Sequence, residues 1–241
     1  MSPTEYAGHE LAAMAEARNY YRWILEQCRT RLGRVVLEHG AGIGTFSTFL
    51  AAEAIEKLLA LEPAANLVPI LRRRLAPWGD KAEVVTSALE ECVSLLRGRD
   101  VDTVISVNVL EHIPDDLATL QAMWEVLPEG GHVILFVPAL PWLYGSLDRA
   151  FEHVRRYRKQ ELYDKLSAAG FKIVDGRFMN FPGIASWLVA GRVLRRPTLD
   201  PLAVKLYDRY VIPIIAKLER LRPPPIGQNL LVIAQKLGTH P

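Results

Sequence analysis

The stretch VVLEHGAGIG, residues 35–44, decides the fold of this chain. It begins with apolar residues, as a buried strand does, reaches the acid Glu38, and continues into glycines at alternate positions. Glycine lets the backbone turn sharply and leaves no side chain between the backbone and a bound molecule. With the helix predicted over residues 45–54, the pattern indicates a strand, a loop and a helix that hold a ligand at the carboxyl end of the strand.

The spacing of the glycines distinguishes this loop from a dinucleotide-binding fingerprint. That fingerprint is G-x-G-x-x-G, with the pyrophosphate at the amino end of the following helix. Here the third glycine, Gly44, comes one position early, and Thr45 stands where the fingerprint has glycine. Taken alone, the loop is also compatible with an ordinary turn between a strand and a helix.

Length and composition favour one sizeable α/β domain over residues 1–241, because half of the 241 residues are hydrophobic. A net charge of +2 gives no reason to expect nucleic-acid binding. Cys28 and Cys92 are predicted to be ordinary thiols, neither a disulfide nor a metal site, and no metal is expected. The sequence shows no basic start, no apolar leader and no apolar run long enough to span a bilayer. We therefore expect a cytoplasmic protein without a signal peptide or transmembrane segment.

Apolar runs predict seven strands that alternate with helical patterns. Such alternation is typical of a doubly wound, mostly parallel seven-stranded sheet with helices on both faces and ligands at the carboxyl ends of the strands. The predicted strands are residues 35–38, 57–62, 83–86, 101–107, 132–137, 171–178 and 229–235.

The sheet and its helices form a core that is predicted over residues 33–180 and 227–241. One helical segment precedes this core, and a second interrupts it. Residues 1–32 are predicted to be an N-terminal helical lid, broken near Gly8. Residues 181–226 are too long for a structureless loop and contain helical patterns at 184–194 and 201–221, which predicts a helical cap. The cap is apolar and basic, so it could shape an amphipathic pocket, dimerise, rest on a membrane surface or simply pack on the sheet.

A second acid, Glu62, ends the second predicted strand about 20 residues after the glycine loop. An acid at this position can accept both ribose hydroxyls of a nucleoside, beside the turn that Pro63 begins. A solvated acid before a proline turn is the alternative.

Two further motifs complete a resemblance. Residues 107–116, VNVLEHIPDD, follow the fourth strand, and residues 127–133, LPEGGHV, precede the fifth. With E-x-G-x-G-x-G, they resemble the Rossmann-like (class I) S-adenosylmethionine (SAM) methyltransferases over residues 32–138. Residues 19–23, the HVRRY run at 153–157 and residues 227–231 resemble a bacterial branch grouped as methyltransferase type 11 or 12.

This resemblance implies SAM as cofactor and a role for each motif. Glu38 would hold the methionine amino group, Glu62 and Pro63 the ribose, and Asn108 and Val109 the sulfonium end. The loop residues Gly40, Ala41, Gly42 and Gly44 would approach the cofactor, and Tyr20 and Tyr21 would be lid contacts unless they only pack the helix. The acid common after the third strand in this superfamily is absent, so Ser87 or the backbone of Ala88 and Leu89 would contact adenine.

The reaction implied is methyl transfer to a small-molecule acceptor, amphipathic or anionic, at oxygen. An oxygen acceptor needs a base, for which His153 is preferred, although this histidine could instead hold Arg155 or Arg156 in place. The acceptor side would comprise His112, Trp142, Tyr144, Arg155 and Arg156, unless the arginines pair with Asp148 and Glu152. A SAM-binding protein without turnover and an NAD-dependent oxidoreductase are the alternatives, and the oligomeric state is not predicted.

Overall fold

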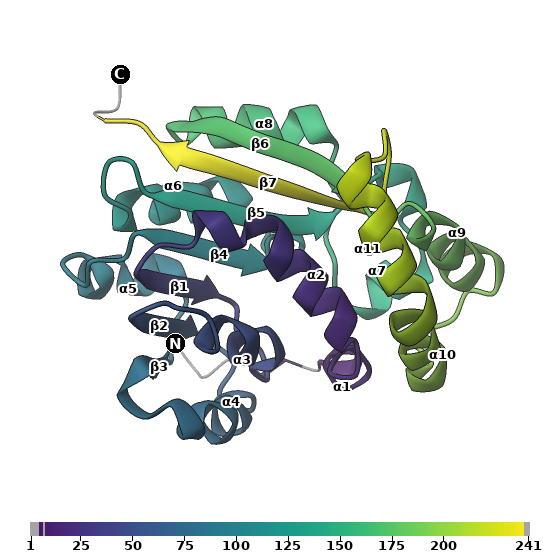
Figure 1. The fold of residues 1–241 in the computed structure, drawn as a ribbon, viewed down its shortest axis with the longest axis horizontal. Helices are drawn as coiled ribbons and strands as arrows, with labels where there is room; N and C mark the ends of the chain where they lie inside the picture. Colours follow the sequence, from purple (N-terminus) through teal and green to yellow (C-terminus); the bar gives the residue numbers. More distant parts are fainter. Residues whose placement is uncertain (1–4, 7, 239–241) are drawn as a thin grey trace.

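A seven-stranded sheet in the order β3-β2-β1-β4-β5-β7-β6 forms the centre of the molecule (Figure 1). The computed structural model describes residues 5, 6 and 8–238. Strands β1 to β5 are parallel, and β7 lies antiparallel between β5 and β6. The strands are β1 (Val35–His39), β2 (Lys57–Leu61), β3 (Ala82–Val85), β4 (Thr103–Val107), β5 (His132–Pro138), β6 (Phe171–Met179) and β7 (Asn229–Lys236).

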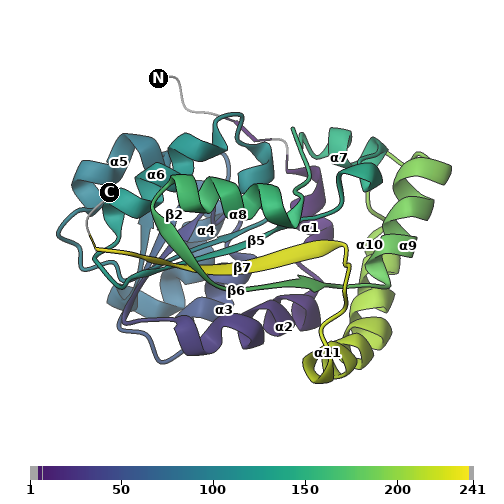
Figure 2. The same ribbon diagram turned by 90° about the horizontal axis from the view of Figure 1, so that it is seen from above.

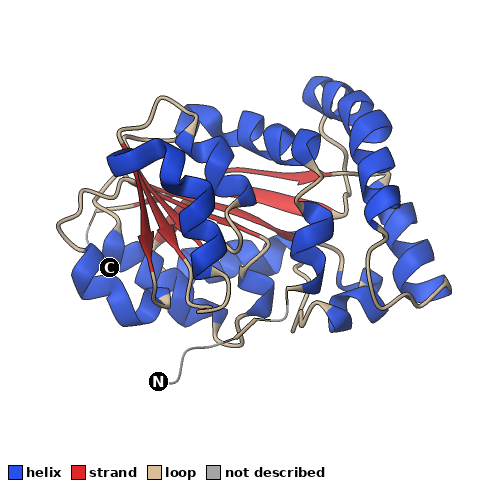
Figure 3. Ribbon diagram, turned by 90° about the horizontal axis from the view of Figure 1, so that it is seen from below, coloured by secondary structure: helices blue, strands red, loops and turns tan. Residues whose placement is uncertain are grey.

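Helices cover both faces of the sheet (Figures 2 and 3). One face carries α2 (Arg18–Cys28), α3 (Thr45–Ala51) and α4 (Val68–Leu75), and the other carries α5 (Leu89–Leu96), α6 (Asp116–Val126) and α8 (Lys159–Ala168). Shorter elements are α7 (Ser146–Ala150) and the 3-10 turns η1 (Arg29–Arg31), η2 (Ala76–Lys81), η3 (Leu110–His112) and η4 (Pro141–Leu143).

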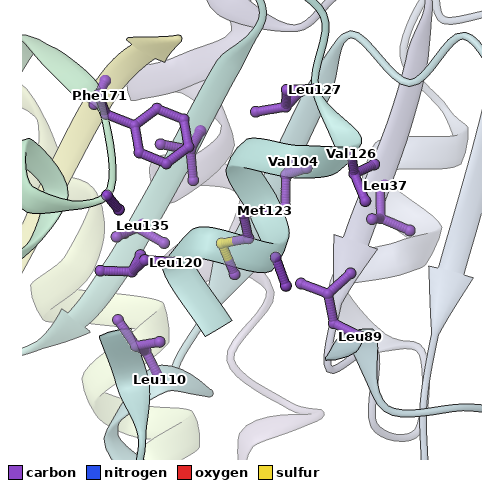
Figure 4. Packing of buried hydrophobic residues seen from close by; sticks show 14 of the residues in the cluster. Leu37, Leu89, Val104, Leu110, Leu120, Met123, Val126, Leu127, Leu135 and Phe171 are labelled. Atoms are coloured by element: carbon purple, nitrogen blue, oxygen red, sulfur yellow. The ribbon is translucent and has the colours of Figure 1, made fainter. Parts of the chain in front are cut away.

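The sheet separates two buried apolar clusters. Successive side chains of a strand point to opposite faces, so Val36 joins one cluster and Leu37 the other. Figure 4 shows the second cluster, in which Leu120 and Met123 of α6 pack against Leu135 and its neighbours. Both faces of the central strands are therefore buried, which explains why these strands are almost continuously apolar in sequence.

The N-terminal helices and the cap lie toward the carboxyl ends of the parallel strands, where the arrows of β1, β4 and β5 point in Figure 1. The N-terminal segment contains α1 (His9–Met14), which is separated from α2 by a short break. The cap contains α9 (Gly183–Leu188), the π-helical turn η5 (Val189–Val193), α10 (Pro201–Leu206), the π-helical turn η6 (Tyr207–Val211) and α11 (Ile212–Leu221). None of the helices in the described part of the chain combines the length and apolar character needed to cross a membrane.

The predicted fold class is confirmed, and the predicted strands differ from the observed ones by at most two residues at an end. Helix ends were predicted less well. The helix predicted over residues 45–54 ends at Ala51, three residues early. The N-terminal helix breaks at residues 15–17 as well as at Gly8, and the short helices α5 and α7 were not predicted.

A buried carboxylate ties the cap to the N-terminal helices. Asp208 of η6 accepts hydrogen bonds from the backbone N–H groups of Asn19 and Tyr20, at 3.1 and 2.8 Å, in the first turn of α2. Those groups have no partner within their own helix, so Asp208 acts as an N-cap supplied from nearly 190 residues away.

We predict that Asp208→Ala lowers the free energy of unfolding by about 1–2 kcal/mol, the usual cost of a lost N-cap. Urea unfolding measures the change. Asp164→Ala, which removes an exposed carboxylate bonded only within its own helix, is the matched control and should cost less than about 0.5 kcal/mol. Equal values for the two variants would show that Asp208 does not anchor α2.

Candidate functional site

The loops that leave β1, β4 and β5 enclose a pocket at the carboxyl edge of the sheet, and α1 covers it. This edge is where ligands bind in open α/β sheets. The pocket is lined from the sheet by residues of the glycine loop and the loops after β4 and β5, and from above by Glu10, Leu11 and Met14 of α1. Tyr6 lies next to α1, where it exchanges two hydrogen bonds with Asn66 and packs edge-on against His112. The N-terminal segment thus spans the pocket from the β2 side to the β4 side.

The glycine loop requires its glycines. Gly40, Gly42 and Gly44 have φ angles of 72°, 55° and 82°, a region that side chains disfavour. A Cβ atom at Gly40 would lie 2.5 Å from the Val109 side chain. At Gly42 it would instead point toward Leu11 of α1 at 3.6 Å, across the pocket. The loop therefore presents bare backbone to the pocket at Gly42.

Glu38 lies under this loop at the end of β1 with its carboxylate incompletely paired. Its Oε2 atom is buried and has no hydrogen-bond partner, although Glu38 lines the pocket. Burial raises the pKa of Glu38 to about 8. A buried acceptor beside a pocket, without its own partner, fits a cationic amine supplied by a ligand, as the amino group of SAM would be.

Glu62 holds the glycine loop in place. One carboxylate oxygen accepts from the backbone N–H of Gly42 at 2.7 Å, and the other from that of Ala64 at 2.8 Å. Burial raises the pKa of Glu62, and the two backbone hydrogen bonds oppose that rise. Since each carboxylate oxygen can accept a second hydrogen bond, this arrangement leaves capacity for ribose hydroxyls.

The segment after β4 turns sharply into the pocket. Asn108 has a φ of 53°, rare outside glycine, and its backbone N–H donates to Phe136 at 2.8 Å. Three residues later Glu111 is fully buried with both carboxylate oxygens unpartnered, and burial raises its pKa to about 7. His112 lines the pocket, and burial lowers its pKa to about 3, so its imidazole is neutral.

His153 lines the same pocket and is oriented by Asp148. Its Nδ1 lies 3.1 Å from the Asp148 carboxylate, and its Nε2 lies 3.9 Å from Glu111. Burial would raise the pKa of Asp148, but hydrogen bonds from His153 and Trp187 and the charge of Arg156 lower it below the usual range. A hydrogen bond donated by Nδ1–H to Asp148 would select the tautomer that has its lone pair on Nε2.

The two arginines of the HVRRY run are engaged within the protein. Arg155 pairs with Asp116 at 2.6 Å and donates to the carbonyl of Pro114, outside the pocket. Arg156 is buried, pairs with Asp148 at 2.6 Å and donates to Ala139. Its remaining Nη2 group is buried without a partner, and Arg156 does line the pocket. The alternative of pairing with acids is therefore observed for both arginines, with Asp148 for Arg156 and with Asp116 rather than Glu152 for Arg155, which lies outside the pocket lining.

Other predicted residues are distributed around the site. Tyr21 lines the pocket and packs against Phe46, whereas Tyr20 is buried beside it and lines a neighbouring chamber of the cap. Trp142 is exposed, and Tyr144 donates its hydroxyl to the carbonyl of His153, behind the imidazole. Outside the pocket lining lie Pro63, Ala88, Leu89 and Val109, with Leu89 fully buried in the core.

The pocket also contains residues that were not predicted. Pocket walls are formed by Phe151 and by Trp187, Gln228 and Asn229, the last with a buried, unpartnered Oδ1 atom. Gln228 and Asn229 belong to residues 227–231, a stretch that resembles the bacterial branch. The resemblance did not assign these residues a role. The pocket-lining residues of α1 belong to no motif that was recognised in the sequence.

Glu111, His112 and His153 also form a group that could hold a cation. One ligand atom of each lies within 4.8 Å of the others, and carboxylate with imidazole suits several divalent metals. No metal site was predicted from the sequence, because His153 lies far along the chain from the adjacent Glu111 and His112. A metal-assisted reaction is thus a second possibility that experiment must separate from base catalysis.

The model of a methyltransferase domain family matches residues 8–175 of this chain. The chain belongs to this family. Membership of a methyltransferase family sets aside the alternative of an NAD-dependent oxidoreductase.

Similar proteins agree with this assignment. A ubiquinone biosynthesis O-methyltransferase of Aliivibrio fischeri is 26% identical over 111 residues, which cover 46% of this chain and 47% of that protein. The chain thus spans about half the length of the first relatives it matches. The corresponding enzyme of Cereibacter sphaeroides is 24% identical over 67% of this chain and 70% of its own length.

Solved structures share the fold. The 1,6-didemethyltoxoflavin-N1-methyltransferase of Burkholderia thailandensis, solved with S-adenosylhomocysteine, superposes with a TM-score of 0.58 at 18% identity, covering 95% of this chain and 82% of that one.

A first prediction concerns Gly42. Gly42→Ala should weaken S-adenosylhomocysteine binding at least about tenfold, because its methyl group would enter the pocket from a strained backbone. Gly98→Ala is the matched control, since Gly98 also has a positive φ of 82° but nothing within 4 Å of its Cβ position. Both variants should lose about 1–2 kcal/mol of stability, and only Gly42→Ala should lose affinity in calorimetry. Equal affinities would place the cofactor elsewhere.

A second prediction concerns Glu38. Because its pKa is about 8 in the free protein, binding an ammonium group requires Glu38 to lose its proton. Affinity for S-adenosylhomocysteine should therefore fall as pH falls below about 8, by up to roughly tenfold per pH unit. Glu38→Gln should bind weakly with no such dependence.

The ligand 5′-methylthioadenosine, which lacks the amino group, provides the control for Glu38. Its affinity should not follow this pH dependence in the wild type. The same pH profile for both ligands would mean that Glu38 does not contact the amino group.

Proposed function

We propose that this protein transfers the methyl group of SAM to an oxygen atom of a small acceptor with an apolar body. The observation that carries the proposal is the pair formed by Asp148 and His153 at the pocket wall, 3.1 Å apart. A hydroxyl acceptor must lose its proton as it attacks, and this pair would direct the Nε2 atom of the imidazole to accept that proton.

Different residues of the chain would hold the cofactor at one end of the pocket and activate the acceptor at the other. When bound, SAM supplies an electrophilic methyl group on a sulfonium centre. Glu38 and the glycine loop would hold its methionine and ribose parts, and α1 would exclude water from above. His153 would accept the acceptor's proton at Nε2, and Asp148 would stabilise the imidazolium that results.

A second chamber supports an apolar acceptor. It has a volume of about 260 Å³, lies under the cap and shares Met14, Trp187, Leu199 and Gln228 with the cofactor pocket. Two of its polar wall residues bond within the protein: Tyr207 donates to Asn180, and Asp208 accepts from α2. Such a wall favours an apolar group whose reactive end reaches His153.

The relatives support oxygen as the acceptor atom, because those with 24–29% identity are named as ubiquinone biosynthesis O-methyltransferases. We also propose a cytoplasmic location. Cys28 and Cys92 are both free and buried, which is compatible with a reducing compartment.

The test is the kinetics of His153→Ala with a hydroxylated apolar acceptor, identified by a screen with radiolabelled SAM. Turnover should fall about 10²–10⁴-fold while S-adenosylhomocysteine affinity stays within about twofold of wild type. His132→Ala, at the opposite end of β5, is the control and should retain both properties.

Chelation separates base catalysis from a metal-assisted reaction. Activity that survives EDTA treatment with its pH profile intact supports His153 as the base. Activity that EDTA abolishes and Mg²⁺ or Zn²⁺ restores would assign Glu111, His112 and His153 to a cation instead. Unchanged turnover in His153→Ala would assign this histidine to structure alone.

A further inference from the structure

The rod formed by α10, η6 and α11 carries a row of exposed apolar side chains along its whole length. Their exposed fractions lie between 48% and 83%, although residues of these types are usually buried. The row consists of Leu202, Leu206, Tyr210, Ile214, Leu218 and Leu221. A contiguous row of this kind differs from scattered surface leucines, because aligned apolar patches mark interaction surfaces.

The π-helical turn keeps this row on one side of the rod. A turn of α-helix takes 3.6 residues, so side chains spaced by four drift slowly around it. The wider turn η6 takes more residues per turn and opposes that drift. On the opposite side, Asp208, Ile212 and Ile215 are buried against the rest of the protein. The rod therefore has a buried inner face and an exposed apolar outer face.

Positive charge flanks the row. Residues 181–226 contain eight basic and three acidic residues, whereas the whole chain has a net charge of only +2. The three acids bond inside the protein: Asp208 caps α2, Asp200 caps α10, and Glu219 accepts from the backbone of Asn180 and Phe181.

The basic side chains of the rod, in contrast, face solvent. Exposed positions are occupied by Lys205, Arg209, Lys217, Arg220 and, just beyond the rod, Arg222. Within the described part of the chain, only Lys205 of these is paired with a carboxylate, Glu16 at 4.0 Å.

We propose that this outer face docks on an anionic phospholipid surface. Apolar side chains at the centre with lysine and arginine beside them are the pattern of a helix that lies in the interfacial plane of a bilayer. The basic residues would pair with anionic headgroups while the row enters the acyl boundary. A second copy of this chain is a poorer occupant, because a symmetric contact would bring the same positive charges together.

Docking would place the cap chamber beside the lipid. Ala203, Val204 and Tyr207 line the chamber from the same rod that carries the outer row. The proposal rests on the surface of the rod and not on the proposed activity, so vesicle binding tests it without an acceptor.

The experiment is flotation of the full chain with vesicles of phosphatidylcholine alone or mixed with phosphatidylglycerol. The wild type should float with the mixed vesicles, much less with phosphatidylcholine alone, and less at high salt. The double variant Ile214→Glu, Leu218→Glu should lose binding by about tenfold or more. Lys217→Ala with Arg220→Ala should weaken binding to the mixed vesicles by about fivefold per charge removed.

Leu95→Glu is the matched control, because Leu95 of α5 is as exposed as Ile214 but lies away from the cap. It should bind like the wild type, and both glutamate variants should keep wild-type circular dichroism and S-adenosylhomocysteine affinity. Hydrogen exchange with mixed vesicles should show added protection at residues 202–221.

Three results would overturn the proposal. One is equal flotation of the Ile214→Glu, Leu218→Glu variant and the wild type. Another is no preference for the anionic vesicles. The third is a dimer in sedimentation velocity that this double variant dissociates, because the row would then bind a second copy of the chain.

Discussion

The buried carboxylate of Asp148 joins the parts of this protein that its chemistry needs. It accepts hydrogen bonds from the backbone of Gly145 and from the side chains of His153, Arg156 and Trp187. These donors come from the start of α7, the loop after it and the cap. His153, the pocket wall and the cap are therefore oriented by one ionised group, which is stable when buried because cations and donors surround it.

This network changes the interpretation of the HVRRY run. Its consecutive side chains reach two buried acids: Arg155 and Tyr157 contact Asp116, while His153 and Arg156 contact Asp148. Tyr157 also bridges to Ala139 through the backbone, next to the end of β5. Most of the run therefore fastens the loop after β5 to the sheet, and two of its anchored members, His153 and Arg156, also line the pocket.

Much of the architecture could be predicted, because parallel strands buried on both faces leave long apolar runs and the glycine loop needs backbone that only glycine adopts readily. Glu38 and Gly42 were recognisable because they belong to the first of these strands and to the glycine loop. The partner of Arg155, Asp116, was not predicted, since sequence cannot show which acid an arginine reaches. The contributions of Leu11 and Trp187 depend on how α1 and the cap fold back over the sheet, and short helices such as α5 give too few turns to be distinguished from loops.

The cap helix has two faces with separate chemical environments. Its inner side shapes the chamber and caps α2 through Asp208, and its outer side concentrates apolar and basic groups. Charge is therefore segregated on the molecule, with the positive excess gathered on the cap while the remainder of the chain is slightly acidic. This segregation gives the molecule a defined orientation in an electric field.

The place at which the cap enters and leaves the sheet has a consequence for how such a protein can diversify. The cap begins after Met179 and ends before Asn229, and these two residues are directly paired in the antiparallel β6 and β7 ladder. Any segment whose ends come together at that spacing can replace it without altering the strand register. Insertions or exchanges there would remodel the chamber while the β1 to β4 edge stays as it is. A changed cap would thus alter the chamber and the part of the pocket that Trp187 and Leu199 line, while Glu38 and the glycine loop keep their places.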